Sequence, residues 1–160
     1  MNTEHTILLV EDNPKDVFLV QRAARKAGII TPLQVVSDGD AAVGYLSGDA
    51  PYGDRAAYPL PVLVLLDLKL PRRSGAEVLS WIRQHPHFRR LPVVVLTSSR
   101  EFADINHIYD LGANAYIVKP ADFDQLVDIL TTLNLHWITY NEKPQLDMDM
   151  DQLGGSGSLA

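Results

Sequence analysis

The sequence predicts an α/β fold built around a parallel sheet. Five short segments are rich in Val, Ile and Leu, and four of them are continuously apolar, as strands buried on both faces are. The stretches between them carry helical spacing or helix-start signals instead of tight hairpin turns, so strand and helix alternate five times. The predicted strands are 7–10, 33–36, 62–66, 93–96 and 115–118.

Helix-start and helix-stop signals divide the rest of the chain into five helices. Asn13 looks like an N-cap, Pro14 fits the first helical position, and apolar residues recur on one face until Gly28 ends the helix. The last helix has an apolar stripe wider than one face, so it needs a second apolar partner. The other four helices are predicted at 38–46, 74–82, 101–111 and 123–140.

One domain is expected over residues 1–140. An apolar content of 46% is enough to bury a core without disulfides. Residues 141–160 are polar and glycine-rich, which is the composition of a flexible tail or of a remnant of expression. Trp137 and Tyr140 extend the wide apolar stripe to the end of the last helix, which favours a homodimer through the face of the fourth and fifth helices.

The composition argues against several classes of partner. The net charge of −6 disfavours nucleic acid, whose binding rests on clustered Lys and Arg. No apolar run approaches the ~20 residues that span a bilayer, and the N-terminus lacks a basic segment leading into an apolar one, so neither membrane insertion nor export is expected. The absence of cysteine excludes disulfides and thiol nucleophiles and fits the cytoplasm.

Polar residues follow every strong strand of the predicted sheet. Because ligands gather at the carboxyl ends of parallel strands, these side chains should share one edge. Three carboxylates there repel one another unless a hard cation neutralises them, and oxygen ligands without His or Cys point to Mg²⁺. The residues are Glu11 and Asp12 after the first strand, Asp67 after the third, Thr97 at the end of the fourth and Lys119 after the fifth.

Asp67 has the surroundings that a phosphoryl acceptor needs. Such a nucleophile must be ionised at neutral pH, and Mg²⁺ and the Lys119 ammonium would keep the pKa of Asp67 down. Phosphoryl transfer spreads negative charge over the equatorial oxygens, which Mg²⁺, Lys119 and the Thr97 hydroxyl could stabilise. Attack by the carboxylate on phosphorus would give an acyl phosphate.

Taken together, these residues resemble the receiver domains of bacterial two-component response regulators, which share an acidic pair, an acceptor Asp, a Ser or Thr and a Lys-Pro. The resemblance spans roughly residues 5–140. Proline follows Asp67 by four residues and glycine by eight, as in the acceptor loop of that family. The resemblance implies a flavodoxin-like, doubly wound (βα)5 fold with a five-stranded parallel sheet in the order 2-1-3-4-5.

The resemblance also implies roles for single residues. Asp12 would be a direct Mg²⁺ ligand, Glu11 a ligand through water, Asp67 both ligand and acceptor, and Lys69 a ligand through its backbone carbonyl. Lys119 would pair with the phosphoryl oxygens. The phosphoryl donor would be a sensor histidine kinase. The protein would then be a phosphoacceptor signalling protein that catalyses only its own phosphorylation and dephosphorylation.

In the family pattern, Thr97 swings toward the new phosphoryl group and Tyr116 turns inward with it, so that together they form a bistable element. The expected output is a phosphorylation-dependent contact with another protein. A narrower resemblance is to the phytochrome-associated single-domain response regulators. It rests on the Glu-Asp-Asn-Pro stretch at 11–14, a long proline-containing loop at 47–61 and Trp137 late in the last helix.

Plainer interpretations remain open. An acidic pair after a strand often only caps a helix, and Tyr116 could be an ordinary half-buried strand residue. A degenerate receiver-like module would bind proteins without being phosphorylated. A phosphatase of the haloacid dehalogenase type, with an aspartate nucleophile, would need a second Asp two residues after Asp67, where this chain has Lys69.

Overall fold

A five-stranded parallel sheet forms the centre of the protein. The computed structural model describes residues 5–146, and within them neighbouring strands pair in parallel in the order β2-β1-β3-β4-β5. The predicted fold class and strand order are therefore confirmed. The strands are β1 (Ile7–Val10), β2 (Leu33–Val36), β3 (Leu63–Leu66), β4 (Val93–Thr97) and β5 (Ala115–Val118).

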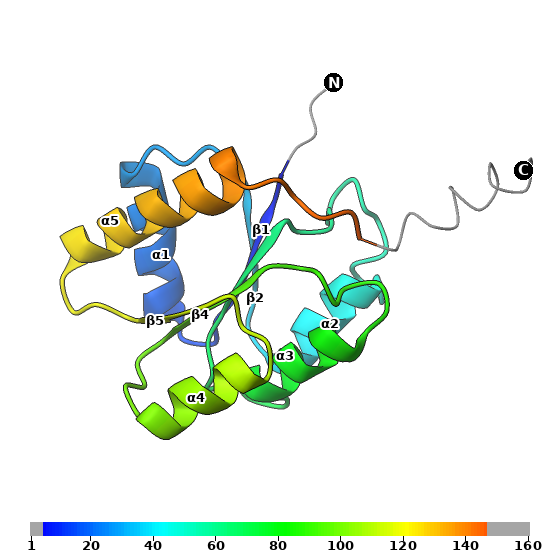
Figure 1. The fold of residues 1–160 in the computed structure, drawn as a ribbon. Coiled ribbons are helices and arrows are strands. Elements are labelled where there is room, and N and C mark those ends of the chain that lie inside the picture. The colour runs from blue at the N-terminus through cyan, green and yellow to red at the C-terminus, as the bar shows by residue number, and fades with distance from the viewer. Residues whose placement is uncertain (1–4, 147–160) are drawn as a thin grey trace, which may run out of the picture.

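Helices cover both faces of this sheet (Figure 1). One face carries α2 (Gly39–Ser47), α3 (Gly75–Gln84) and α4 (Phe102–Asp110), and the other carries α1 (Pro14–Lys26) and α5 (Phe123–Leu133). A parallel sheet covered in this way has strands that are buried on both sides, which explains their continuous apolar runs. In the part of the chain that is described, none of the helices could cross a membrane.

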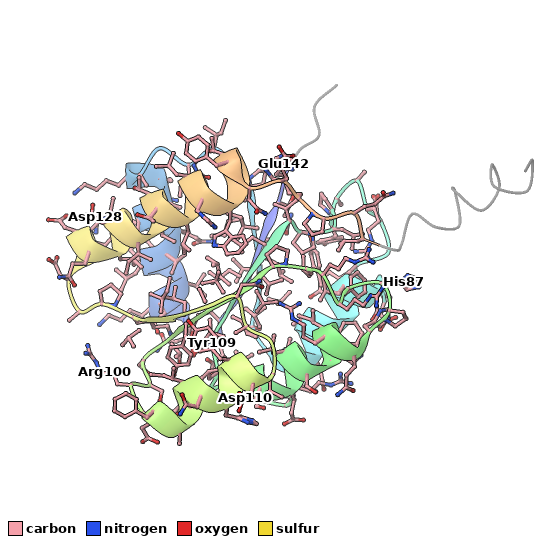
Figure 2. The ribbon with its side chains drawn as sticks, viewed as in Figure 1. His87, Arg100, Tyr109, Asp110, Asp128 and Glu142 are labelled. Carbon is pink, nitrogen blue, oxygen red and sulfur yellow. The ribbon has the colours of Figure 1, made fainter. Side chains whose placement is uncertain are left out.

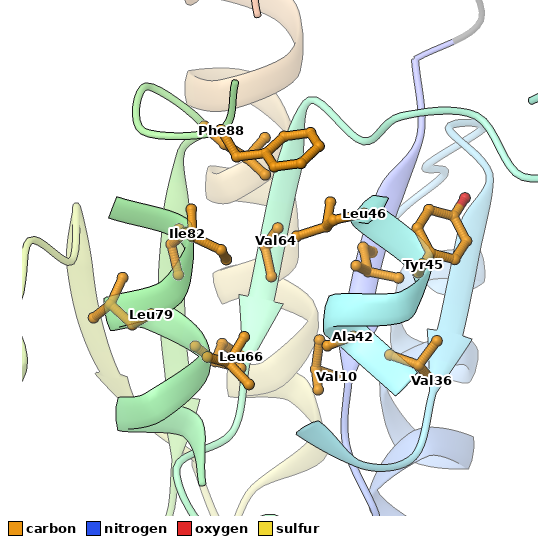
Figure 3. Packing of buried hydrophobic residues seen from close by; sticks show 14 of the residues in the cluster. Val10, Val36, Ala42, Tyr45, Leu46, Val64, Leu66, Leu79, Ile82 and Phe88 are labelled. Atoms are coloured by element: carbon orange, nitrogen blue, oxygen red, sulfur yellow. The ribbon is translucent and has the colours of Figure 1, made fainter. Parts of the chain in front are cut away.

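Each face of the sheet has its own apolar core. Successive side chains of a strand point to opposite faces, so Leu8 and Val10 of β1 join the core beneath α2 and α3, whereas Ile7 and Leu9 join the core beneath α1 and α5. Figure 3 shows the first of these cores, in which strand residues such as Val64 meet side chains of both helices. These two cores hold the strand ends rigidly in place.

The helix starts follow the predicted capping signals. The Asn13 side chain accepts hydrogen bonds from the backbone N–H groups of Lys15 and Asp16, and Pro14 occupies the first helical position. At the start of α3, Ser74 and Glu77 form a reciprocal capping box. Both caps lie at the sheet edge where the polar strand ends meet, so they fix the helices that border this edge.

The last helix differs from the prediction of one regular helix over 123–140. α5 ends at Leu133, and the chain continues as a π-helical segment, η1 (Asn134–Tyr140). The Asn141 backbone N–H donates to the His136 carbonyl five residues earlier, as in a π turn. The Lys143 ammonium donates to the carbonyls of Ile138 and Asn141 and so covers the end of this segment.

The connection between α2 and β3 is long but well packed. Tyr45, Tyr52 and Tyr58 form a group of ring contacts with centroids 5.2 to 6.0 Å apart. The Arg55 guanidinium donates to the carbonyls of Tyr45 and Leu46 at the end of α2. This loop is therefore anchored on α2.

Part of the predicted C-terminal tail contacts the domain. Within 141–160, Leu146 packs against the core beneath α2 and α3, so contacts with the domain extend past residue 140. Residues 147–160, the greater part of the predicted tail, lie outside the described residues.

Candidate functional site

Four strands deliver polar residues to one edge of the sheet. Hydrogen bonds between neighbouring strands continue one residue beyond the regular ladder: the Asp67 N–H donates to the Val10 carbonyl at 3.0 Å, and the Lys119 N–H donates to the Thr97 carbonyl at 2.7 Å. Similarly, the Glu11 N–H donates to β2. The edge includes the reversal of strand order between β1 and β3, where ligands bind in open α/β sheets.

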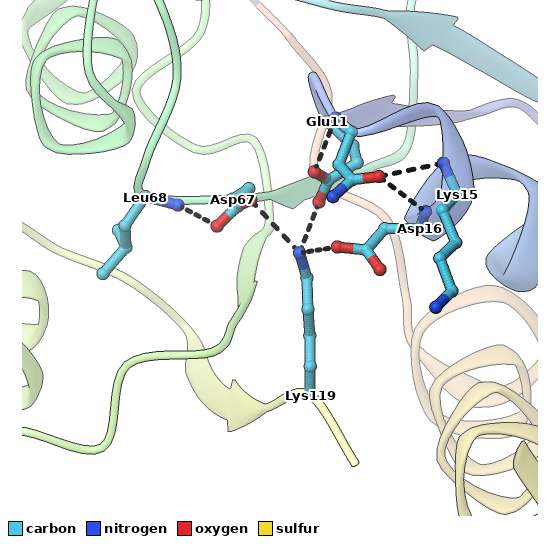
Figure 4. A network of polar contacts seen from close by, with 7 residues as sticks. Glu11, Lys15, Asp16, Asp67, Leu68 and Lys119 are labelled. Atoms are coloured by element: carbon cyan, nitrogen blue, oxygen red, sulfur yellow. Dashed lines mark hydrogen bonds and ion pairs between the residues drawn. The ribbon is translucent and has the colours of Figure 1, made fainter. Parts of the chain in front are cut away.

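Lys119 connects the carboxylates of this edge. Its ammonium donates to Glu11 Oε2 at 2.6 Å, to Asp16 Oδ2 at 2.9 Å and to Asp67 Oδ2 at 3.1 Å (Figure 4). An ammonium group has three N–H donors, so these three bonds engage all of them. The Lys119 side chain is 17% exposed, and water screens these ion pairs less than it would at the surface.

Three carboxylates lie close enough to share a cation. Glu11, Asp12 and Asp67 each offer an oxygen, and these oxygens lie within 4.8 Å of one another. Glu11 and Asp67 are buried, whereas Asp12 is exposed. An all-oxygen, anionic donor set of this size fits a hard divalent cation such as Mg²⁺. Lys69, the remaining predicted ligand, lies in the loop that follows Asp67 and borders a hollow of about 210 Å³ next to α4.

Burial changes the electrostatics of Glu11 and Lys119. Burial raises the pKa of Glu11 to about 7, while hydrogen bonds from Lys119 and from the Asn13 backbone act in the opposite direction. For Lys119, burial alone would lower the pKa, but the hydrogen bonds to Glu11 and Asp16 outweigh it and raise the pKa. Lys119 is therefore a permanent cation in this site.

The backbone around Asp67 fixes its carboxylate. Asp67 Oδ1 accepts from the Leu68 N–H at 2.7 Å, and Oδ2 accepts from Lys119. Gly75 lies directly against this turn: its N–H donates to the Leu68 carbonyl, and a Cβ at this position would lie 2.2 Å from the Asp67 carbonyl oxygen. Only glycine can approach so closely, which gives a physical reason for the glycine eight residues after Asp67.

Thr97 and Tyr116 lie on adjacent strands near Asp67. Thr97 is fully buried, and its hydroxyl has no hydrogen-bond partner among the described residues. A buried hydroxyl without a partner is costly and is uncommon in folded proteins. Tyr116 is half-buried, and its hydroxyl donates to the Ser99 carbonyl at 2.9 Å in the segment that follows Thr97.

Asp16 is the site residue that the sequence patterns did not predict. The patterns identified residues at strand ends, whereas Asp16 lies in the first turn of α1 and reaches Lys119 from there. The sequence held only an indirect signal for Asp16. The cap at Asn13 and Pro14 fixes where the first turn of α1 begins, and an acidic residue in that turn lies beside the end of β1.

This fold and this arrangement of polar strand ends define a receiver domain. Residues 7–131 match the response regulator receiver domain family, and the chain belongs to it. The predicted family is thereby confirmed.

The proteins similar to this chain include phytochrome and bacteriophytochrome response regulators. The chain is similar to the phosphorylated cyanobacterial phytochrome response regulator RcpA, with 38% identity, a TM-score of 0.81 and coverage of 89% of this chain and all of RcpA. It is 37% identical to the response regulator Rcp1 of Synechocystis sp., covering 86% of this chain and 91% of Rcp1. It is equally identical to the probable methanogenesis regulatory protein FilR2 of Methanothrix harundinacea, covering 86% of each chain.

Proposed function

We propose that this protein is a response regulator that accepts a phosphoryl group onto Asp67 from a sensor histidine kinase. The main support is the convergence of the Asp67 carboxylate, the Lys119 ammonium and the neighbouring carboxylates at one sheet edge. In the transfer, an oxygen of Asp67 forms a bond to phosphorus while the bond from phosphorus to the kinase histidine breaks. Lys119 then faces the added negative charge.

A divalent cation, which we propose to be Mg²⁺, belongs to this site. Asp12 and Asp67 would bind it directly, Glu11 through water and Lys69 through its backbone carbonyl. When bound, the cation supplies positive charge against the phosphoryl oxygens. In support of this assignment, the similar protein Rcp1 has been crystallised in an Mn²⁺-bound form, at 36% identity and a TM-score of 0.77 over 88% of this chain and 99% of that one.

Thr97 and Tyr116 form the proposed switch. Among residues 5–146 the Thr97 hydroxyl has no hydrogen-bond partner, so a nearby phosphoryl oxygen would give it one and would favour the arrangement in which it turns toward Asp67. Movement of Thr97 would change the space next to Tyr116, whose hydroxyl bonds to the Ser99 carbonyl before α4. The phosphoryl group on Asp67 would thereby alter the surface of α4 and β5 that other proteins contact.

The proposed signalling context takes its support from a relative. RcpA is a phytochrome response regulator, so we propose that a phytochrome is the kinase that phosphorylates this chain. We place this transfer in the cytoplasm, in keeping with a sequence that has no cysteine. We further propose a homodimer through the face of α4 and α5. The phosphatase alternative has no support in the acceptor loop, because Lys69 occupies the position of the second aspartate.

Phosphorylation of the purified protein by acetyl phosphate with Mg²⁺ tests the acceptor assignment. Intact mass spectrometry should show the gain of one phosphoryl group in the parent and none in Asp67→Asn, because the amide cannot act as an anionic nucleophile. Asp110→Asn is the matched control, since Asp110 lies exposed on α4 (Figure 2) and should leave the gain unchanged. A gain in Asp67→Asn equal to that of the parent would contradict the assignment.

A further inference from the structure

One carboxylate that contacts Lys119 lies outside the acidic cluster. The Asp16 side chain is 31% exposed, and its Oδ2 lies 2.9 Å from the Lys119 ammonium. Unlike Glu11, Asp12 and Asp67, it is not one of the three carboxylates whose oxygens lie within reach of one shared cation. Asp16 therefore contacts the lysine without belonging to the candidate cation site.

The other two partners of Lys119, Glu11 and Asp67, would also bind the cation. Glu11 and Asp67 both belong to the acidic cluster, so the oxygens that hold the ammonium are on the same carboxylates that a divalent cation would use. Lys119 and the cation thus compete for these two groups. Asp16 is the one acidic partner of Lys119, within the described residues, that stays available when a cation engages the cluster.

The position of Asp16 is fixed by the start of α1. Its backbone N–H donates to the Asn13 side chain, and Pro14 limits the backbone of the first turn. Few side-chain bonds separate its carboxylate from this rigid turn, so Asp16 can hold the ammonium in a constant place (Figure 4).

We propose that Asp16 is a positioning residue that anchors Lys119 and frees Glu11 and Asp67 to bind the cation. This inference rests on the proposed phosphoacceptor function and deepens it. With Asp16 holding one N–H of the ammonium, a second can turn from Asp67 to a phosphoryl oxygen. Without Asp16, the ammonium would rest only on the two carboxylates that the cation needs.

A Mg²⁺ titration by calorimetry on the full chain, without any phosphodonor, tests the anchor. Asp16→Asn should weaken Mg²⁺ binding about five- to tenfold, within the range of couplings between contacting charged groups, and Asp16→Glu should restore most of the affinity. Asp124→Asn is the matched control. Like Asp16, Asp124 lies in the first turn of a helix and pairs with a lysine, but this helix is α5 and the lysine is Lys26. This variant should bind Mg²⁺ as the parent does.

The Lys119→Met background separates anchoring from a simple loss of negative charge. If Asp16 acts through Lys119, Asp16→Asn should change the Mg²⁺ affinity of the Lys119→Met protein by less than about twofold. If only the lost charge matters, Asp16→Asn should weaken Mg²⁺ binding equally in the parent and in the Lys119→Met protein. Equal weakening in the two backgrounds, or an unchanged affinity in Asp16→Asn with a parent-like melting temperature, would overturn the proposal. Failure of Asp67 to become phosphorylated would overturn the acceptor assignment instead and would leave this titration interpretable.

Discussion

Glu11 is a buried carboxyl group at the centre of the candidate site. It is almost completely buried, it accepts a hydrogen bond from Lys119, and it belongs to the cluster of three carboxylates. Burial penalises its charged form and raises its pKa to about 7, although hydrogen bonds from Lys119 and from the Asn13 backbone oppose the shift. Without a cation, Glu11 therefore takes up a proton within the physiological pH range.

We predict that Mg²⁺ affinity increases with pH until about pH 7 and then levels off. Below the raised pKa of Glu11, a proton competes with the cation for this carboxylate, so each pH unit costs up to about tenfold in affinity. Calorimetry between pH 5.5 and 8.5, in buffers of different ionisation enthalpy, measures both the affinity and the proton released. In Glu11→Gln the affinity should be lower and this pH step absent. A parent affinity that stays constant from pH 5.5 to 8.5 would contradict the prediction.

At the residue scale, the sequence identified side chains that belong to strand ends and missed one that does not. Continuous apolar runs locate the ends of buried strands, so Glu11, Asp67 and Lys119 could be placed at one edge without coordinates. Asp16 reaches the same lysine from a helix. That contact depends on how α1 is oriented relative to the sheet, which no local sequence pattern specifies.

At the element scale, the start of α3 determines the shape of the acceptor turn. The capping box of Ser74 and Glu77 fixes the first turn of the helix, and Gly75 then lies against the Asp67 backbone. A Cβ on Gly75 would lie 2.6 Å from the Leu68 Cα as well as 2.2 Å from the Asp67 carbonyl oxygen. Backbone atoms held by a sheet cannot move aside easily.

Gly75→Ala should therefore displace the acceptor turn. We expect a loss of about 1–3 kcal/mol in the free energy of unfolding, as for other overpacked sites, together with slower phosphorylation by acetyl phosphate. Gly44→Ala is the control: it lies in α2, and the nearest atoms to its added Cβ are 3.9 Å away. It should keep or slightly raise stability, because alanine favours the helix. Denaturant unfolding and intact mass measure both effects, and a parent-like Gly75→Ala would refute this explanation of the glycine.

The end of the last helix shows what element-scale patterns miss. Capping signals located the starts of the helices well, because caps depend on one or two residues. The broad apolar stripe after residue 123 suggested one helix with a second partner. Instead, the π-helical segment allows Ile138 to pack against the same core as Leu133, five residues earlier. A pattern read with a 3.6-residue period cannot reveal that change of period.

At the scale of the whole molecule, alternation of strand and helix was enough to predict a parallel sheet, but not its order. The order depends on which face of the sheet each connecting helix covers. A strand that is buried on both sides is apolar throughout, so its sequence does not indicate that face. The order 2-1-3-4-5 came from the resemblance to receiver domains, and the structure confirms it. Quaternary structure is still harder to predict from local sequence patterns.

The α4–β5–α5 side of the molecule has the apolar surface that a homodimer would use. β5 is an edge strand, and a hollow of about 230 Å³ between it and α5 is lined by Ile117, Ile129 and Leu133. On α4, Phe102 is 82% exposed, and Tyr109 is also exposed. Exposed apolar surface of this kind is typical of protein contact surfaces.

Thr132→Glu should convert the proposed homodimer into a monomer. Thr132 is exposed at the rim of this hollow, next to Asp128. In a twofold interface the same patch faces its own copy, so one added carboxylate places four acidic groups at the contact instead of two. Gln84→Glu adds the same charge on α3 and should leave the dimer intact. Sedimentation velocity over a range of concentrations measures the association. A parent that stays monomeric, or a Thr132→Glu protein that associates as strongly as the parent, would show that this face does not hold two copies together.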